Sequence, residues 1–263
     1  MNNQEIYSVE PKNLYDYDFR LLLKSFFDDD IYHPIFSLNI KSKCKIEKGN
    51  SIIILKPSAI GLATVLDKAI FIYSLSKAEY LISEKLIEPY SPIPITVHLL
   101  LNSLGKSSAG SVYTHFKNSL IRISETTFSL KNLNLENNLK NFRILKLIET
   151  TKLEISSRNK TAISIKLPKY VWDAIIQKKL IKLNRNYFKL KSSLERILYE
   201  VANYTCTDKK SHTLSVDELK LLCGSTGTDQ YFKNHLYKTI KSKDFLDYEI
   251  KISGKHVIIE KKD

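Results

Sequence analysis

The sequence predicts an α+β protein made of two similar units, each built from short helices followed by strands. A short helix, a glycine turn and a longer amphipathic helix come in that order at residues 96–125, and the order returns at residues 215–243. Each pair of helices is followed by stretches in which polar and apolar residues alternate, as is typical of β-strands. This succession predicts two tandem winged helix-turn-helix units.

The chain of 263 residues is long enough for two modest domains with cores of their own. We expect an N-terminal segment over residues 1–34, a first winged-helix domain over residues 35–180 and a second over residues 181–263. Residues 178–191 are expected to link the two domains. The acidic run at residues 28–30 indicates a solvated turn, because no second acidic or histidine cluster completes a metal site.

Residues 36–62 read as strands, and Lys48-Gly49-Asn50 in their middle is typical of a turn. They predict a β-hairpin whose apolar strand, at residues 52–55, is a candidate edge for a homodimer. Asp67 is expected to cap the following helix over residues 68–83. Three prolines after that helix keep the next linker extended.

The first predicted helix-turn-helix begins at Thr96, which is a plausible N-cap, and its short helix is expected to end at Gly105. Ser107 or Ser108 then caps a longer helix with one apolar and one polar face. The apolar face carries Tyr113, Phe116, Leu120 and Ile123.

Two β-rich runs follow, FRILKLIETTKLEIS and KTAISIKLP, and predict a long hairpin, or wing, with the basic turn Arg158-Asn159-Lys160 between them. A wing tip of this kind lies where phosphates or the minor groove can be touched. Pro168 then opens a helix in which Trp172 is expected to anchor the core.

The second unit repeats the pattern. Residues 194–202 predict an amphipathic helix, and Ser215 with Glu218 forms a capping box for a short helix that ends at Gly224. Thr228 or its predecessors open a longer helix, and two alternating strands follow, joined at Ser253-Gly254-Lys255.

The distribution of charge favours a polyanionic partner. The chain has 41 Lys and Arg against 28 Asp and Glu, a net charge of +13, although 35 of the 41 are Lys, a bias that an AT-rich genome also produces. Residues 1–50 carry a net charge of −1, whereas residues 101–150 carry +4 and residues 151–200 carry +8. The excess begins with the first predicted helix-turn-helix, and this placement favours duplex DNA.

The polar faces of the two longer helices are the candidate DNA-reading surfaces, because the second helix of this motif enters the major groove while the first crosses the backbone. Asn118, Gln230 and Asn234 suit adenine readout, and arginines for guanine are scarce, so we expect an A·T-rich duplex. The candidate DNA-binding residues are Lys106, Ser108, Ser111, Thr114, His115, Lys117, Asn118, Arg122, Arg158, Lys160, Gln230, Lys233, Asn234, Lys238, Lys241 and Lys255.

We expect no catalytic residues, cofactor or metal site, and therefore no enzyme. The six histidines never stand two residues apart, which excludes the His-hydrophobic-His site of rolling-circle nicking proteins. Gly105-Lys106-Ser107 imitates the end of a phosphate loop, but Leu100 stands where the Walker pattern requires Gly. Cys206, His212 and Cys223 lack the spacing of zinc ligands.

The three cysteines are odd in number and far apart, which fits a reducing compartment. The polar and acidic N-terminus MNNQEIYSVEPK is no signal peptide, and no apolar run approaches the length of a membrane span. We expect a soluble cytoplasmic protein with no membrane partner.

Several segments spread over residues 35–250 share a pattern with a known family. They are GLATVLDKAIFIYSLS, the helix and strand containing RISETTFSL, and the distal segments LERILYEVANYTC, LSVDELKLLCGS, YFKNHLYKTI and LDYEIKI. These segments resemble the plasmid replication initiator protein A family (RepA type). The resemblance implies tandem winged-helix proteins that bind direct repeats (iterons) at a plasmid origin, help to open the duplex and recruit the host initiator and helicase. It also implies no catalytic centre, and initiators often repress their own promoter.

Two other interpretations stay open at this point. A winged-helix transcriptional regulator without a replication role has the same sequence features, and a scaffold that binds no DNA would owe its basicity to its genome. Tandem repeats of about 20 base pairs beside the gene, two turns of the duplex, favour initiation. A lone inverted repeat favours regulation.

Overall fold

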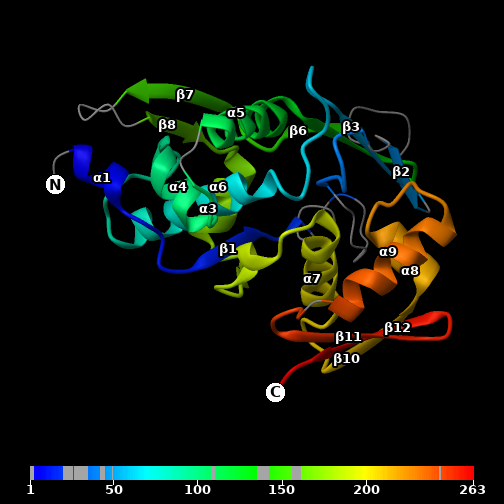
Figure 1. Ribbon diagram of the computed structural model, residues 1–263. Helices are drawn as coiled ribbons and strands as arrows, with labels where there is room; N and C mark the ends of the chain where they lie inside the picture. The colour runs from blue at the N-terminus through cyan, green and yellow to red at the C-terminus, as the bar shows by residue number, and fades with distance from the viewer. Residues whose placement is uncertain are drawn as a thin grey trace.

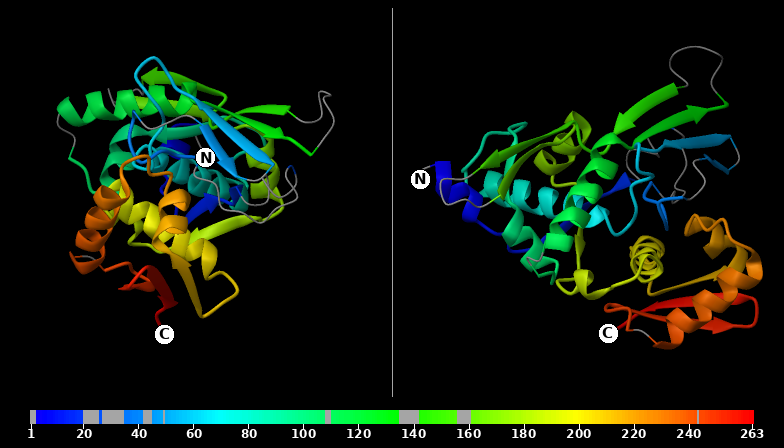
Figure 2. Two further views of the ribbon diagram at one scale, coloured as in Figure 1. Left: turned by 90° about the vertical axis from the view of Figure 1, so that its right-hand side faces the viewer. Right: turned by 45° about the horizontal axis from the view of Figure 1, so that its top comes forward.

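The computed structural model describes residues 3–19, 26, 35–41, 45–48, 50–107, 110–134, 142–155, 161–242 and 244–263. The predicted mixture of helices and strands is confirmed. The segments from α7 (Ser193–Thr205) to β12 (His256–Lys261) gather apart from the elements that precede them, as two further views also show (Figures 1 and 2). None of the described helices is long and apolar enough to cross a membrane.

The first unit consists of a buried helix, a short strand, two helices and two strands, with a β-hairpin inserted after the helices. Its three-stranded antiparallel sheet has the order β4-β8-β7. Its elements, without the insertion, are α3 (Lys68–Ser83), β4 (Ile93–Thr96), α4 (Val97–Ser103), α5 (Gly110–Glu125), β7 (Thr150–Ile155) and β8 (Thr161–Lys166).

The second unit repeats this succession without the insertion. Its three-stranded antiparallel sheet has the order β10-β12-β11, so in both units the first strand pairs with the last and the last pairs with the middle one. Its elements are α7 (Ser193–Thr205), β10 (Ser211–Ser215), α8 (Val216–Leu222), α9 (Asp229–Ser242), β11 (Tyr248–Ser253) and β12 (His256–Lys261).

A four-stranded antiparallel sheet of order β2-β3-β5-β6 joins the insertion to the chain before the first unit. The predicted hairpin β2–β3 is present, but β3 lies between β2 and β5, with both of its edges paired. The expectation that residues 52–55 form a dimer edge is therefore wrong. The four strands are β2 (Lys45–Lys48), β3 (Ser51–Lys56), β5 (Thr127–Asn132) and β6 (Phe142–Lys146).

The run FRILKLIETTKLEIS is not one arm of a hairpin. It contains β6 and β7, which belong to different sheets. Between them Leu147 and Ile148 are consecutive and both fully buried, so the alternation of inward and outward side chains stops there. The chain crosses from one sheet to the other at this point, and only β7 and β8 form the predicted hairpin.

Residues 178–191 are more than a linker. They contain β9 (Leu180–Leu183) and the 3₁₀ helix η2 (Tyr187–Lys189), and β9 pairs antiparallel with β1 (Leu14–Tyr17) near the N-terminus. The short α1 (Asn3–Ser8) precedes β1, and α6 (Lys169–Ile176) precedes β9 with Trp172 in the core, as predicted. The N-terminal segment is thus built into the sheet that leads from one unit to the other.

Helix α3 is the centre of the larger group of elements. It contacts β1, β4, α5 and α6, and every residue from 68 to 78 is buried. The Nζ atom of Lys68 lies 2.6 Å from a carboxylate oxygen of Asp16 in β1 and 2.9 Å from one of Glu200 in α7. These ion pairs join the N-terminal strand, the first unit and the second unit.

Turn residues end the short helices as predicted. Gly105 and Gly224 have φ angles of +65° and +63°, and the N–H of the residue after each glycine donates to the third-last helical carbonyl, a Schellman motif. The capping box of Ser215 and Glu218 is confirmed. Thr96 and Asp67 stand at N-cap positions but make no capping hydrogen bond, because their side chains bind Tyr7 and Arg122 instead.

Lys77 gives a test of this packing. It is fully buried in α3, where its Nζ donates to the carbonyl of Tyr7 at 3.2 Å. Burial lowers the pKa of Lys77 to about 7, although the charge of Glu10 opposes the shift. Between about pH 7 and 10 the unfolded chain therefore binds a proton that the folded chain does not, so Lys77 makes the free energy of unfolding rise with pH. We expect Lys77→Met to abolish that rise in urea titrations, whereas Lys56→Met, at an exposed lysine, keeps it. Equal pH dependence in wild type and Lys77→Met would contradict this assignment.

Candidate nucleic-acid interface

Helix α5 is held by its apolar face and presents its polar face outward. Phe116 and Ile123 are buried, and Tyr113 and Leu120 are half-buried against the core, as the spacing of these residues predicts. On the other side Ser111, Thr114, His115 and Lys117 are exposed and Asn118 is half-buried. The helix ends in Glu125, its single acidic residue.

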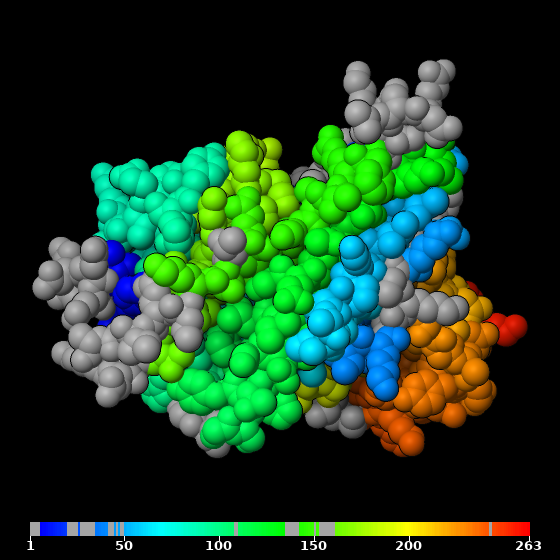
Figure 3. All heavy atoms as spheres, turned by 90° about the horizontal axis from the view of Figure 1, so that it is seen from above, coloured from blue at the N-terminus to red at the C-terminus, as the bar shows by residue number. Residues whose placement is uncertain are grey.

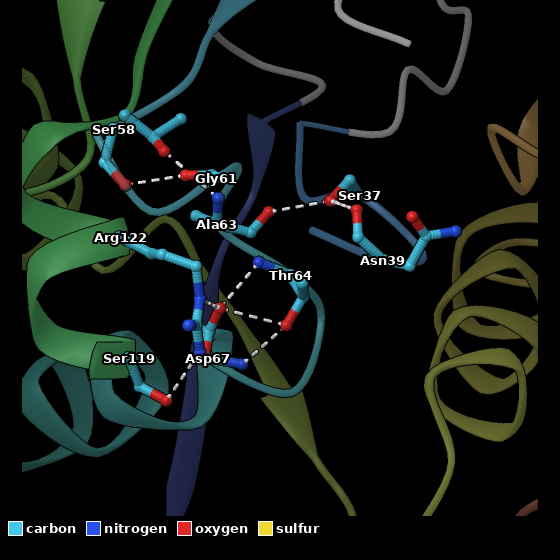
Figure 4. A network of polar contacts seen from close by, with 10 residues as sticks. Ser37, Asn39, Ser58, Gly61, Ala63, Thr64, Asp67, Ser119 and Arg122 are labelled. Carbon is cyan, nitrogen blue, oxygen red and sulfur yellow. Dashed lines mark hydrogen bonds and ion pairs between the residues drawn. The ribbon is translucent and has the colours of Figure 1, made fainter. Parts of the chain in front are cut away.

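The sequence predicts that Arg122 contacts DNA, but its guanidinium is bound within the fold. Its Nε and one terminal nitrogen donate to the two carboxylate oxygens of Asp67 at 2.8 and 2.7 Å, and the same terminal nitrogen reaches Ser119. Asp67 also accepts hydrogen bonds from the backbone and hydroxyl of Thr64 (Figure 4). Arg122 thus fastens α5 to the segment that opens α3, and these hydrogen bonds raise its pKa further.

A groove separates α5 from the hairpin β7–β8, on the side of the molecule that Figure 3 shows. Its volume is about 590 Å³, and its floor is mainly apolar, with Phe116 and Leu120 from the helix and Ile163 from β8. Lys117 on α5 and Lys152 on β7 line opposite walls. The lining of the groove thus includes two lysines, one from the helix and one from the hairpin, and one acidic residue, Glu125 at the end of α5.

Helix α9 repeats this arrangement in the second unit. Phe232 and Leu236 are buried, whereas Gln230, Lys233, Asn234, Lys238 and Lys241 are exposed. The amide nitrogen of Gln230 donates to the amide oxygen of Asn234 at 3.1 Å, so these two amides hold one another on the surface. The acidic residue Asp229 at the start of the helix binds Lys220 of α8.

The exposed face of α9 also carries two tyrosines that sequence reasoning missed. Tyr231 is 66% and Tyr237 is 60% exposed. In a helix of 3.6 residues per turn, Tyr237 falls beside Asn234 and Lys241. Both rings therefore add aromatic surface to the exposed side of α9.

Two further candidates lie at turns. Lys106 is exposed in the turn between α4 and α5, and Lys255 is exposed in the two-residue turn between β11 and β12. Ser108, Arg158 and Lys160 lie outside the described residues. The candidates that the structure does describe therefore lie on two helices and in two turns.

The family model for replication initiator protein A matches residues 28–250 of this chain. The chain belongs to the replication initiator protein A family. It is 31% identical over 224 residues to a putative replication protein of Wigglesworthia glossinidia brevipalpis, and the alignment covers 83% of this chain and 81% of that one.

The fold of this replication initiator A protein resembles that of domains 2 and 3 of RctB. One crystal structure, of selenomethionine derivatives, matches with a TM-score of 0.64 and 12% identity and covers 91% of this chain and 97% of that one. A second, of RctB residues 155–483, matches with a TM-score of 0.57 and 14% identity and covers 87% and 95% of the two chains. At these identities the likeness concerns the fold.

Catalysis would require a metal site or an activated nucleophile. Within the described ranges no three His, Cys, Asp or Glu residues gather as metal ligands would. Cys206 and Cys223 are buried free thiols, and burial raises the pKa of both, so neither is activated as a thiolate. The two buried cysteines therefore contribute to packing.

The contact between Arg122 and Asp67 yields a prediction that separates stability from binding. Arg122→Ala leaves the buried carboxylate of Asp67 without its cation, so we expect the free energy of unfolding to fall by on the order of 3 kcal/mol. Lys117→Ala removes an exposed side chain from the same helix and should change it by less than about 0.5 kcal/mol. Urea unfolding of both variants measures this, and wild-type stability in Arg122→Ala would show that the ion pair does not hold α5.

Proposed function

We propose that this replication initiator binds repeated duplex DNA, iterons, at a plasmid replication origin through two tandem winged helix-turn-helix domains. One observation carries the proposal: the same succession of elements and the same strand order occur twice. Each copy leaves one polar helix, α5 or α9, with an exposed basic and amide-bearing face. In the proposed domains, spanning residues 35–180 and 181–263, these are the recognition helices.

The remaining elements take the other roles of the motif. Helices α4 and α8 cross the DNA backbone, and the hairpins β7–β8 and β11–β12 are the wings. The groove between α5 and its wing, with Lys117 and Lys152 on its walls, admits a phosphate backbone. Lys255 at the tip of the second wing adds a further phosphate contact.

Two recognition helices on one chain suit a repeated site. Successive major-groove faces are separated by one helical turn, about 10.5 base pairs, so a single molecule spans roughly two turns of duplex. The exposed amides of Gln230 and Asn234, together with Asn118, are suited to bidentate contacts with adenine. The proposed target is therefore A·T-rich, with the lysines bound to phosphates.

The protein acts in this proposal without catalysis, as a binding factor in the cytoplasm. Its family membership supports a part in replication, and the resemblance to iteron-binding initiators supports recruitment of a host initiator and helicase. Binding of the same sequence near its own gene would also repress its own promoter.

Selection from a random duplex pool tests which side chains read sequence. Wild-type protein should select an A·T-rich consensus, and Asn118→Ala should relax that consensus at one or two positions, because it removes one amide. Lys117→Ala should keep the consensus and weaken binding to all duplexes about equally. A G·C-rich consensus, or identical effects of the two variants on specific and random DNA, would contradict the proposed reading face.

A further inference from the structure

The turn between α4 and α5 meets the beginning of the second unit. Gly105 lies in this turn with a φ of +65°, and the Nζ atom of Lys191, just before α7, lies 3.9 Å from where a Cβ of Gly105 would stand. Lys106 follows Gly105 directly. Two lysines from the two units therefore meet at one turn of the proposed DNA-binding motif.

Arg196, in the first turn of α7, is the buried member of this group. Its side chain is 6% exposed, its Nε donates to the carbonyl of Leu190 at 2.9 Å, and its guanidinium lies 5.4 and 5.7 Å from the ring centres of Tyr187 and Phe188. One terminal nitrogen of this guanidinium is buried and has no hydrogen-bond partner. A buried charged donor without an acceptor is costly, and negative charge near the guanidinium would offset part of that cost.

Two of the three charges that act on Lys106 are positive. Partial desolvation, and then the charges of Arg196 and Lys191, lower the pKa of Lys106, while Asp67 opposes the shift. Asp67 is engaged by both nitrogens of Arg122, and the carboxylate of Glu195 accepts the backbone N–H of Lys191. The charges of Arg196 and Lys191 therefore both act against that of Lys106, and an anion beside Lys106 would relieve this repulsion.

We propose that Lys106, Lys191 and Arg196 form a phosphate-binding site between the two units, and that a backbone phosphate of bound duplex DNA occupies it. A phosphate offers several acceptor oxygens, which suits donors that come from two chain segments. The turn of a helix-turn-helix also lies beside the DNA backbone. This inference rests on the proposed function and adds a contact that neither recognition helix makes.

One shared phosphate has a mechanical consequence. It binds the first unit through Lys106 and the second through Lys191 and Arg196, so bound DNA holds the two units in one relative orientation. Recognition by α5 and α9 is then coupled through the backbone between their sites.

The salt dependence of binding to duplex repeats tests this site with Lys106→Ala, Lys191→Ala and the double variant. Each neutralised phosphate contributes about 0.9 to the slope of log affinity against log salt concentration. If both lysines share one phosphate, each single variant lowers the slope by up to about 0.9 and the double variant lowers it no further. Lys189→Ala, at an exposed lysine of η2, is the matched control and keeps the wild-type slope.

The other outcomes are distinct. If both lysine variants behave as Lys189→Ala does while the wild type binds DNA with a steep salt slope, the site is overturned and the proposed function stands. Additive losses of about 0.9 for each lysine would overturn the shared phosphate. Wild-type protein without salt-dependent binding would contradict both the function and the site.

A measurement with inorganic phosphate distinguishes a DNA phosphate from a free phosphate ion as the occupant of the site. Thermal unfolding is compared in phosphate and chloride buffers of equal ionic strength, for wild type and the double variant. A phosphate-specific rise in Tm that the double variant loses, combined with an unchanged slope for DNA binding, would show a free-phosphate site and overturn the assignment to DNA. A smaller salt slope for DNA binding in the lysine variants supports the assignment to DNA. This test does not require a substitution of the buried Arg196.

Discussion

The ion pairs of Lys68 are the interaction on which the arrangement of the chain depends. One buried ammonium faces Asp16 from β1 and Glu200 from α7, and Glu200 also accepts the hydroxyl hydrogen of Tyr187. Burial raises the pKa of Asp16 to about 6 against the opposing charge of Lys68, so two carboxylates share one cation at a cost in desolvation. Removal of the cation would leave both carboxylates buried and unbalanced, so this contact fixes where the N-terminal strand and the second unit attach to α3.

This attachment leaves α5 and α9 with one packed face each. Helix α3 is buried at every residue from 68 to 78, whereas α5 and α9 pack through a narrow apolar stripe and expose amides, hydroxyls and lysines. Each helix carries one acidic residue: Glu125 at the end of α5, where it lines the groove, and Asp229 at the start of α9, where it binds Lys220. The electrostatic field of these helices therefore favours an anionic partner.

Local signals carried most of the sequence-based prediction. Apolar spacing in α5, α7 and α9, the capping box at Ser215 and the positive-φ glycines act within a few residues, so the sequence displays them directly. Pairings across the chain were hidden. β4 has four residues including Pro94 and β10 has five, too short for alternation to be recognised, and β9 was read as linker because its partner β1 lies about 165 residues earlier.

The candidate site also contains features that the sequence predicts and features that only tertiary packing creates. The periodicity of apolar residues predicts which residues of both helices are exposed. It also places Arg122 on the DNA face, because its partner Asp67 lies 55 residues earlier in the sequence. The junction of Lys106, Lys191 and Arg196 was equally hidden, since it joins a turn to a helix some 85 residues later. Charge partners that meet only through tertiary packing need a structure to be seen.

The central claim is that two similar units of one replication initiator each read a face of the same duplex. Footprinting on a single repeat tests it most directly, with wild type compared to a variant carrying Asn234→Ala and Lys238→Ala on α9. We expect wild type to protect two major-groove faces about one helical turn apart, and the variant to lose one of them and keep the other. Protection of a single face that the changes on α9 leave untouched would contradict the account.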